Sequence, residues 1–184
     1  RRYEPGSCGK AINCIEARID SDDPQHIAGE IQAKGANITI GYYKNEEATK
    51  AAFTDDGFLK TGDLGIMDAE GNIFIKGRSK SMILSANGQN IYPEEIEAIV
   101  NNQQFVVESV VVGRSGKIVA LVYLDDDAVK KSGLDTEAIS DIPENIRRQA
   151  NKKLPGYSKI TKVEQVMVPF EKTPKMSIKR FLYK

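Results

Sequence analysis

The longest apolar runs of this chain are the length of a β-strand. One run is Val106-Val107 followed by Val110-Val111-Val112, and the other is Val119-Ala120-Leu121-Val122. A helix that crosses a membrane needs about 20 consecutive apolar residues, so no transmembrane span is expected. Arg114-Ser115-Gly116 lies between the two runs and is typical of a turn. The sequence therefore predicts two strands, over 106–112 and 117–124, joined by that turn.

Predicted helices and one more strand complete a small domain around these two strands. Proline suits the first turn of a helix and acidic residues favour its positive end, so Pro93-Glu94-Glu95 predicts a helix over 93–100. A polar helix is predicted over 143–153 and a strand over 159–168, with a brief strand over 83–85 at the start. This order, β-α-β-β-α-β, is typical of a compact α+β domain.

The first third of the chain has a different, β-rich character. A strand is predicted over 27–34, a short helix over 45–53, and a β-hairpin over 65–76 that turns through Asp68-Ala69-Glu70-Gly71. We therefore expect an α+β chain with a β-rich N-terminal part and a small α+β domain in which helices flank a central sheet. The boundary is predicted near Arg78 to Lys80.

Composition excludes several classes of function. Lys plus Arg and Asp plus Glu both number 26, so no bulk charge draws the chain to nucleic acid or to an anionic membrane. With one histidine, two cysteines and no Cys-x-x-Cys pair, we expect no metal site, no His-based triad and no disulfide framework. The N-terminus lacks an apolar signal core, so a reducing cytoplasm is the expected location. The chain begins in what reads as mid-domain sequence, which suggests a fragment.

Two polar positions in the β-rich part suggest a sugar-binding site. A Gly62-Asp63 step on a turn would expose a carboxylate that can accept two hydrogen bonds, as the paired hydroxyls of a ribose require. Arg78 follows fifteen positions later at the end of the predicted hairpin, where its fork of donors could reach the same nucleotide. Each position also fits a plainer interpretation, a solvated aspartate on a β-turn and a surface arginine at a strand end.

Two further segments lie in the α+β domain. Gly88 leads the segment GQNIYPEEIE, where a glycine loop before a helix would let a ligand pass close to the backbone, or would be a plain helix start. The C-terminus is basic, and Lys175, Lys179 and Arg180 could meet phosphate there or form a solvated tail.

Taken together and in this order, these segments resemble one superfamily. KTGDL, GRSKSMIL, GQNIYPEEIE and a Lys-rich Thr-Pro segment near the end are similar to the adenylate-forming acyl- and aryl-CoA synthetases, peptide-synthetase adenylation domains and luciferases. The upstream stretch GEIQAKGANITIGYYKNEEAT resembles the family segment before the TGD motif, through Gly29, Glu30, Gly35, Gly41 and Tyr42. The IYPEEIE segment and the Thr-Pro-x-x-x-x-Lys-Arg ending look most like long-chain fatty-acid–CoA ligases.

The resemblance implies a different role for each segment of the chain. Family members use ATP to turn a carboxylate into an acyl-adenylate, and their C-terminal domain then rotates so that coenzyme A can attack. Residues 1–77 would be the end of the large AMP-binding domain, 78–80 the hinge and 81–184 the mobile C-terminal domain. Asp63 and Arg78 would hold the ribose of ATP or AMP, Lys80 would be the hinge residue, and Gly88 would line the pantetheine tunnel.

The catalytic lysine of the family has no direct counterpart here. Aligning Thr173-Pro174 on the family pattern places Ser177 where the lysine should be, and serine supplies no charge. Lys175 and Lys179 each lie two residues from that position and are the candidate catalytic residues, with Lys179 slightly preferred for its place in the Lys-Arg step. Residues two apart on an extended strand share a face, so either could substitute after a local change of register.

Other parts expected of the family would lie upstream of Arg1. These are the phosphate loop, the segment that binds adenine and Mg²⁺, and the acyl pocket, so the isolated fragment is predicted to be inactive. The implied cofactors are ATP, coenzyme A and Mg²⁺, the metal being held mainly by residues absent from this chain. The implied partners are fatty acid, ATP, coenzyme A and the missing N-terminal domain, with peripheral membrane contact possible and no nucleic acid.

Two alternatives remain open at this point. The chain could come from an adenylation domain that loads a carrier protein. It could also be a non-catalytic relative that acts as an interaction module, and Ser177 at the lysine position is the main support for that alternative.

Overall fold

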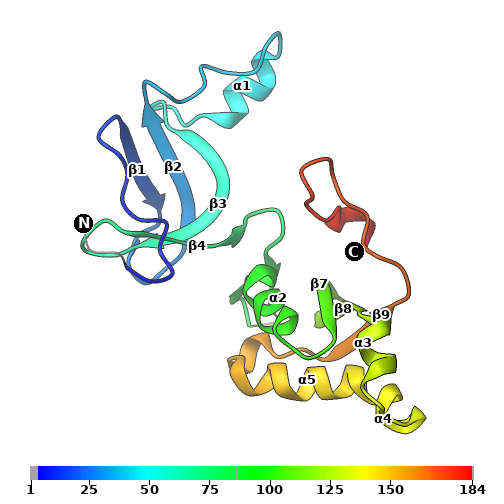
Figure 1. Cartoon of the computed structure of the whole chain (residues 1–184). Helices are drawn as coiled ribbons and strands as arrows, with labels where there is room; N and C mark the ends of the chain where they lie inside the picture. Colours follow the sequence, from blue (N-terminus) through cyan, green and yellow to red (C-terminus); the bar gives the residue numbers. More distant parts are fainter. Residues whose placement is uncertain (1–3, 86, 184) are drawn as a thin grey trace. The chain divides into compact units, whose positions relative to one another are not determined.

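The computed structural model describes residues 4–85 and 87–183. The chain divides into two compact units, Arg1–Ser81 and Met82–Lys184, and each is described by itself (Figure 1). The fold is mixed α+β, as predicted, with a β-rich first unit and helices concentrated in the second.

The first unit is built on a four-stranded antiparallel sheet. Its strands follow chain order, β1-β2-β3-β4, with bounds Ile15–Asp20, Gly29–Gly35, Leu59–Met67 and Ile73–Arg78. Helix α1, Glu46–Ala52, lies in the chain between β2 and β3. The sequence did not predict β1, because its residues IEARID are half charged and become a strand only through pairing with β2.

The predicted hairpin has the expected turn but longer strands. Gly71 N donates to Asp68 O at 3.0 Å, which closes the turn at the predicted place. However, β3 begins at Leu59 and not at Gly65, and β4 runs on to Arg78. The early half of β3 pairs with β2 from far away in sequence, a partner that local periodicity cannot reveal.

An aromatic ring and an ion pair stabilise the first unit together. Phe58 is buried, and the guanidinium of Arg18 lies 3.9 Å from the centre of its ring. The same guanidinium donates to both carboxylate oxygens of Asp56, at 2.6 and 3.0 Å. Arg18 therefore covers the ring while its charge is neutralised by Asp56.

The second unit is organised around a three-stranded sheet. Strand β7, Val106–Arg114, pairs antiparallel with β8, Lys117–Leu124, and β8 pairs parallel with β9, Lys162–Val166. The first two strands match the prediction closely. Strand β9 is shorter than the predicted 159–168 at both ends, because only Lys162–Val166 pair with β8.

Helices cover one face of this sheet. Helix α2, Pro93–Asn101, and helix α5, Ile142–Lys153, were both predicted within a residue. Two short helices, α3 (Asp126–Lys131) and α4 (Thr136–Ser140), were not predicted. Each is less than two turns long, too short to show helical periodicity, although each begins at an aspartate cap. A two-residue pair of strands, β5 (Ile83–Leu84) and β6 (Asn90–Ile91), precedes α2.

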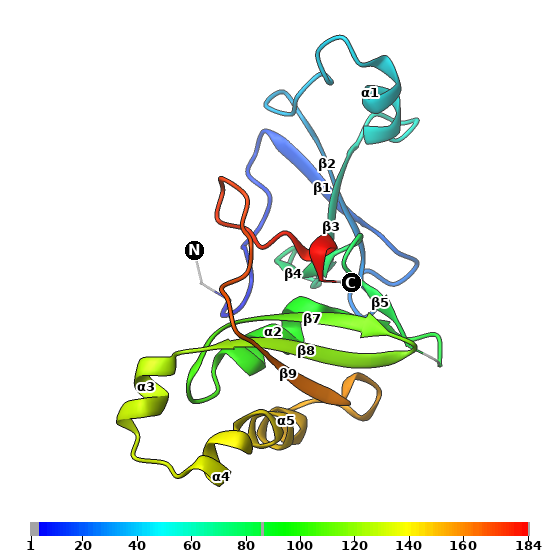
Figure 2. The same ribbon diagram turned by 90° about the vertical axis from the view of Figure 1, so that its right-hand side faces the viewer.

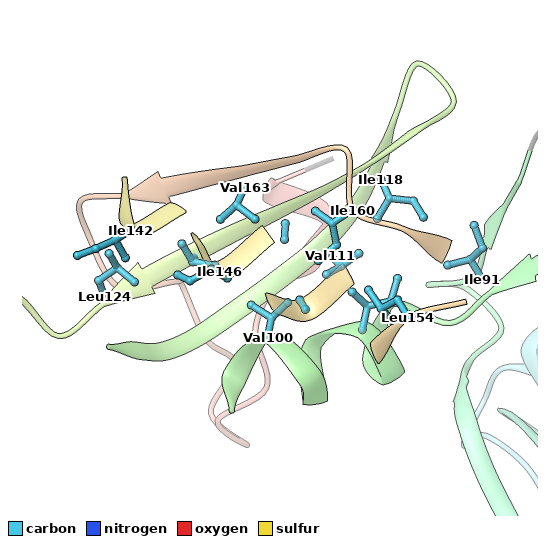
Figure 3. Close-up of a cluster of buried hydrophobic side chains, with 14 of the residues drawn as sticks. Ile91, Val100, Val111, Ile118, Leu124, Ile142, Ile146, Leu154, Ile160 and Val163 are labelled. Atoms are coloured by element: carbon cyan, nitrogen blue, oxygen red, sulfur yellow. The ribbon is translucent and has the colours of Figure 1, made fainter. Parts of the chain in front are cut away.

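The apolar core of the second unit occupies both faces of the sheet. The larger cluster lies between the sheet and the two long helices (Figure 3), and includes Val100, Val111, Ile118, Ile146, Leu154 and Ile160. The smaller cluster, on the other face, consists of Val110, Val112, Val119, Leu121 and Phe170. No helix of the described residues covers this second face. It is covered by the C-terminal segment after β9, and Figure 2 shows that segment and α5 on opposite sides of the strands.

In the part of the chain that the structure describes, none of the helices has the length and apolar character that crossing a membrane requires.

Because of the Arg18–Asp56 pair, we expect the folding stability of the first unit to depend on pH. Hydrogen bonds from Arg18 and then Thr54 lower the pKa of Asp56 from 3.8 to about 2. A lowered acid pKa stabilises the folded state above the unfolded pKa, and this contribution is lost as the pH falls toward about 2. We expect Asp56→Asn to lower the unfolding temperature of β1 and β2 at neutral pH and to have progressively less effect in acid.

NMR amide signals of β1 and β2, followed during heating at several pH values, measure this. The neighbouring Asp55→Asn is the matched control and should change little. An equal effect of Asp56→Asn at neutral and strongly acid pH would contradict the prediction.

Candidate functional site

Thr61, Gly62 and Asp63 form a bulge inside strand β3. Across the β2–β3 pair, Glu30 aligns with Leu64 and Gln32 with Lys60, so the three bulge residues lie opposite a single residue of β2. The expectation that Gly62 and Asp63 lie on a turn was therefore wrong. Gly62 has φ +74, a conformation that costs a residue with a side chain about 1–2 kcal/mol, and it bends the strand without ending it.

The polar groups left by the bulge are satisfied within it. Gly62 N donates to Glu30 Oε1 at 2.9 Å, and the hydroxyl of Thr61 donates to Ile31 O at 2.7 Å. Asp63 N in turn donates to the Thr61 hydroxyl at 3.1 Å. Because these bonds replace missing ladder bonds, the backbone that carries Asp63 is held in one conformation.

Strand pairing brings Asp63 and Arg78 together. The two residues align across the β3–β4 ladder, and Arg78 Nε lies 2.8 Å from Asp63 Oδ1. Asp63 is 28% exposed and Arg78 is 63% exposed, so the pair is open to solvent. Ser79 N also donates to Gly62 O at 3.0 Å, which ties the end of β4 to the bulge. The site thus offers carboxylate acceptors and guanidinium donors side by side.

The predicted hinge and loop residues both lie in turns. Lys80 is in the turn that follows β4, where Ser81 N donates to Arg78 O at 3.0 Å, close to the division between the two units. Gly88 lies between β5 and β6, with φ +76 and its N donating to Ser85 O at 3.0 Å. A Cβ on Gly88 would meet nothing within 4 Å, so only its φ requires glycine.

A hollow of about 380 Å³ lies just beyond the Gly88 loop, within the second unit. Its walls come from β6, the exposed side of α2 and the chain after α5, and include Ile91, Tyr92, Lys153 and Tyr157. This arrangement offers apolar surface, aromatic rings and one cation next to the loop.

The Lys-rich C-terminal segment folds into a small hairpin over 172–178. Lys172 and Ile178 form an antiparallel bridge, and Thr173 N donates to Ser177 O at 2.8 Å. Met176 N donates to Thr173 O at 2.9 Å and Met176 has φ +61, so the chain reverses around Lys175. The argument that residues two apart share a face assumed extended backbone here, and the tight turn was not predicted because its positive φ falls on methionine, not on glycine.

The hairpin separates the two candidate catalytic lysines. Lys179 lies at its base, where Nζ is 3.1 Å from Glu171 Oε2. Lys175 lies at the tip, is exposed, and has no hydrogen bond or ion pair with any residue of 4–85 or 87–183. Ser177 lies in the hairpin itself, with its N directed to the Thr173 hydroxyl at 3.3 Å.

Arg180 is directed into the domain and not toward solvent. Its Nη1 donates to Glu97 Oε1 at 2.6 Å, and its Nη2 donates to the other oxygen of Glu97. Glu97 is 7% exposed and also accepts a bond of 2.6 Å from Val111 N. Arg180 Nη2 further lies 3.6 Å from Glu94 Oε1. The expectation that Arg180 meets phosphate or lies in a solvated tail therefore has no support in this geometry.

The role of Glu97 was not predicted. The acids at the start of this helix were expected to interact with the helix dipole, yet Glu97 lies among Pro93, Ile96 and Val100 on the buried face of α2. A charged residue at apolar-face spacing was the available signal, since such residues are rarely buried without a partner.

Burial and pairing act against each other in this ion pair. Burial raises the pKa of Glu97, although hydrogen bonds from Arg180 and Val111 N oppose the shift. Burial also acts against the charge of Arg180, but its bonds to Glu97 outweigh this and raise the pKa of Arg180. Pairing thus prevails over burial for Arg180, whereas burial prevails over pairing in the direction of the shift at Glu97.

Comparison with known proteins identifies the family. The sequence pattern of the AMP-binding enzyme C-terminal domain matches residues 80–183, more than half of the chain. The chain belongs to the AMP-binding enzyme family. Its second unit, with the three-stranded sheet and the C-terminal hairpin, is the C-terminal domain of such an enzyme.

Individual relatives extend this match over both units. A 2-succinylbenzoate–CoA ligase of Bacillus mycoides is 36% identical over 184 residues, covering 96% of this chain and 34% of the relative. The long-chain-fatty-acid–CoA ligase FadD15 of Mycobacterium tuberculosis is 32% identical over 195 residues, covering 95% of this chain and 31% of the relative.

A solved structure of another ligase also matches both units of the chain. The O-succinylbenzoate coenzyme A synthetase MenE of Bacillus subtilis, in complex with AMP, matches with a TM-score of 0.82 and 27% identity, over 98% of this chain and 36% of that protein. The chain thus spans about a third of the length of these relatives. The expected family is confirmed, while the preference for long-chain fatty-acid ligases within it is not, since 2-succinylbenzoate–CoA ligases match at higher identity.

We expect Glu30 to protect the Gly62 amide of the bulge from hydrogen exchange. Replacing it by alanine removes the acceptor of Gly62 N, and a hydrogen bond contributes about 1 kcal/mol net. We expect Glu30→Ala to speed hydrogen exchange of the Gly62 amide about fivefold, measured by NMR on the 184-residue chain. Glu70→Ala, on the exposed turn before β4, is the matched control. Unchanged exchange at Gly62 would show that the bulge does not depend on Glu30.

Proposed function

We propose that this chain is part of an ATP-dependent ligase that converts a carboxylic acid into an acyl-adenylate and then into a coenzyme A thioester. The observation that carries the proposal is the solvent-open Asp63–Arg78 pair, fixed by the bulge of β3 in a member of the AMP-binding enzyme family. The two ligases reported above, which act on 2-succinylbenzoate and on long-chain fatty acids, support the reaction class.

The pair has the chemistry that a ribose requires. The carboxylate of Asp63 can accept hydrogen bonds from both hydroxyls of the sugar, and the exposed guanidinium of Arg78 can donate to a sugar oxygen from the side. Residues 1–77 would then be the end of the large domain, with the hinge at 78–80 around Lys80 and the mobile domain over 81–184. Coenzyme A would pass Gly88, whose loop lies beside the hollow described above. Mg²⁺ would be held mainly by residues upstream of this chain.

Geometry favours Lys175 as the catalytic cation, in contrast to the preference drawn from sequence. The group that stabilises charge on the α-phosphate must have a side chain that is free to contact it. Lys175 is exposed at the hairpin tip, whereas Lys179 is paired with Glu171 at the base. We propose that Lys175 takes the catalytic role of the family lysine, whose position in this chain is occupied by Ser177.

Single substitutions in the full-length protein test this assignment. Lys175→Ala should lower ATP–pyrophosphate exchange by about 10²- to 10³-fold, the usual effect of removing one charged stabiliser. Lys179→Ala should change exchange only a few-fold, and Lys130→Ala on α3 is the matched control. A larger loss from Lys179→Ala would reverse the assignment. No loss from either would favour the non-catalytic interaction module.

The acid substrate and the acceptor need a separate experiment. Fatty acid remains the proposed substrate from the C-terminal motif, and 2-succinylbenzoate is the competitor because its ligases match this chain at higher identity. We expect the full-length protein to form a coenzyme A thioester with one of these two acids. Turnover only with a carrier protein would favour the carrier-loading adenylation domain.

The isolated 184-residue chain should be inactive, because it spans only about a third of its relatives. The prediction is that it shows no ATP–pyrophosphate exchange with any fatty acid. A clear exchange signal from the isolated chain would contradict it.

A further inference from the structure

The C-terminal hairpin is joined to the rest of its domain by ionic contacts at both ends. At one end, Lys172 Nζ lies 2.6 Å from Glu108 Oε2, and Glu108 is only 16% exposed. At the other end, Arg180 follows the closing residue Ile178 by two positions and binds Glu97 with both guanidinium nitrogens. The tip that carries Lys175 therefore projects between two fixed points.

The Arg180–Glu97 contact has a geometry that single-point contacts lack. Two parallel hydrogen bonds between a planar guanidinium and a planar carboxylate fix orientation as well as distance. The carboxylate of Glu97 is itself oriented by a hydrogen bond from Val111 N, in the middle of strand β7. Helix α2, strand β7 and the C-terminal segment thus meet at one carboxylate.

Stability alone does not account for this pair. Burial raises the pKa of Glu97, so desolvation offsets part of the stabilisation that its bonds to Arg180 and Val111 N provide. Glu94 adds a second carboxylate near the same guanidinium, and one of its oxygens, Oε2, is buried without a partner among the described residues. Buried ion pairs of this kind are often no more stabilising than apolar residues of similar size. Its distinctive contribution is a defined geometry.

We propose that Arg180 is a positioning residue for adenylate formation, which through Glu97 on α2 sets the place of the hairpin tip and of Lys175 within the domain. The guanidinium of Arg180 is directed to Glu97 and Glu94, so Arg180 would act through the hairpin and not on the substrate itself. The proposal rests on the function proposed above for its catalytic consequence, while its structural consequence stands without it.

The second half of the reaction should not depend on Arg180. The Gly88 loop, where coenzyme A is proposed to pass, lies before the N-terminus of α2 in the chain. It is held by the β5–β6 pair and by Ile91 in the main core. Loosening the hairpin should therefore leave thioester formation unchanged, whereas a general loss of folding would lower both steps.

The experiment measures the two half-reactions separately in the full-length protein. Arg180→Ala should lower ATP–pyrophosphate exchange about 10- to 100-fold, as a small misplacement of a catalytic group does, mainly in kcat with little change in KM for ATP. Thioester formation from a preformed acyl-adenylate should stay within about twofold. Arg180→Lys, which keeps the charge but not the two-pronged geometry, should fall between the parent and Arg180→Ala.

Arg148→Ala, on the exposed side of α5, is the matched control and should leave both steps unchanged. Equal losses in the two half-reactions, or exchange at the parent level in Arg180→Ala, would overturn the positioning role.

Hydrogen exchange of the 184-residue chain tests the proposal without any activity. Arg180→Lys should speed exchange of the Thr173 and Met176 amides, which close the hairpin, and leave the amides of β8 unchanged. If the parent protein shows no ligase activity but these amides respond, the proposed function fails and the positioning contact stands. If the amides do not respond, or if β8 responds equally, the positioning contact itself is wrong.

Discussion

Strand β8 is buried on both faces, and the second unit is arranged to satisfy that constraint. Five consecutive residues from Ile118 to Val122 are buried, alternating between the two core clusters. The helices cover one face. The other is covered by the C-terminal segment, through Phe170, Ile178 and Tyr183. Burying apolar surface in this way stabilises the fold by about 25 cal/mol per Å², and it also brings the basic end of the chain back onto the domain.

Apolar burial determines how the sheet and helices are layered, whereas polar contacts determine the local backbone conformation at the candidate site residues. In the first unit, Glu30 and Thr61 complete the hydrogen bonds of a bulge and so hold Asp63 beside Arg78. In the second, Glu97 and Glu108 hold the two ends of the hairpin that presents Lys175. In both units a buried or half-buried acid, contributed by a neighbouring element, holds the backbone that carries a candidate site residue.

Much of the fold could be predicted because its signals are local. The valine-rich runs gave strands β7 and β8 their correct places, and proline with acids marked the start of α2. Strand β1 and the first half of β3 were missed because their pairing partners are distant in sequence. The bulge at Gly62 and the hairpin turn at Met176 were missed for a local reason. Each depends on a positive φ, inside a strand at Gly62 and on a methionine at Met176, where residue propensities do not predict it.

The sequence by itself determined the family and the fold class, because motif order and apolar patterning are local features of the chain, and it supplied the candidate residues for nucleotide binding. The tertiary structure decided which of those residues have a free side chain. It paired Lys179 with Glu171, left Lys175 exposed at a turn, and drew Arg180 inward to Glu97. The reason is that side-chain pairing depends on the folded chain: the hairpin places Glu171 beside Lys179, eight positions away, and the sheet brings Glu97 of α2 to Arg180, eighty-three positions away.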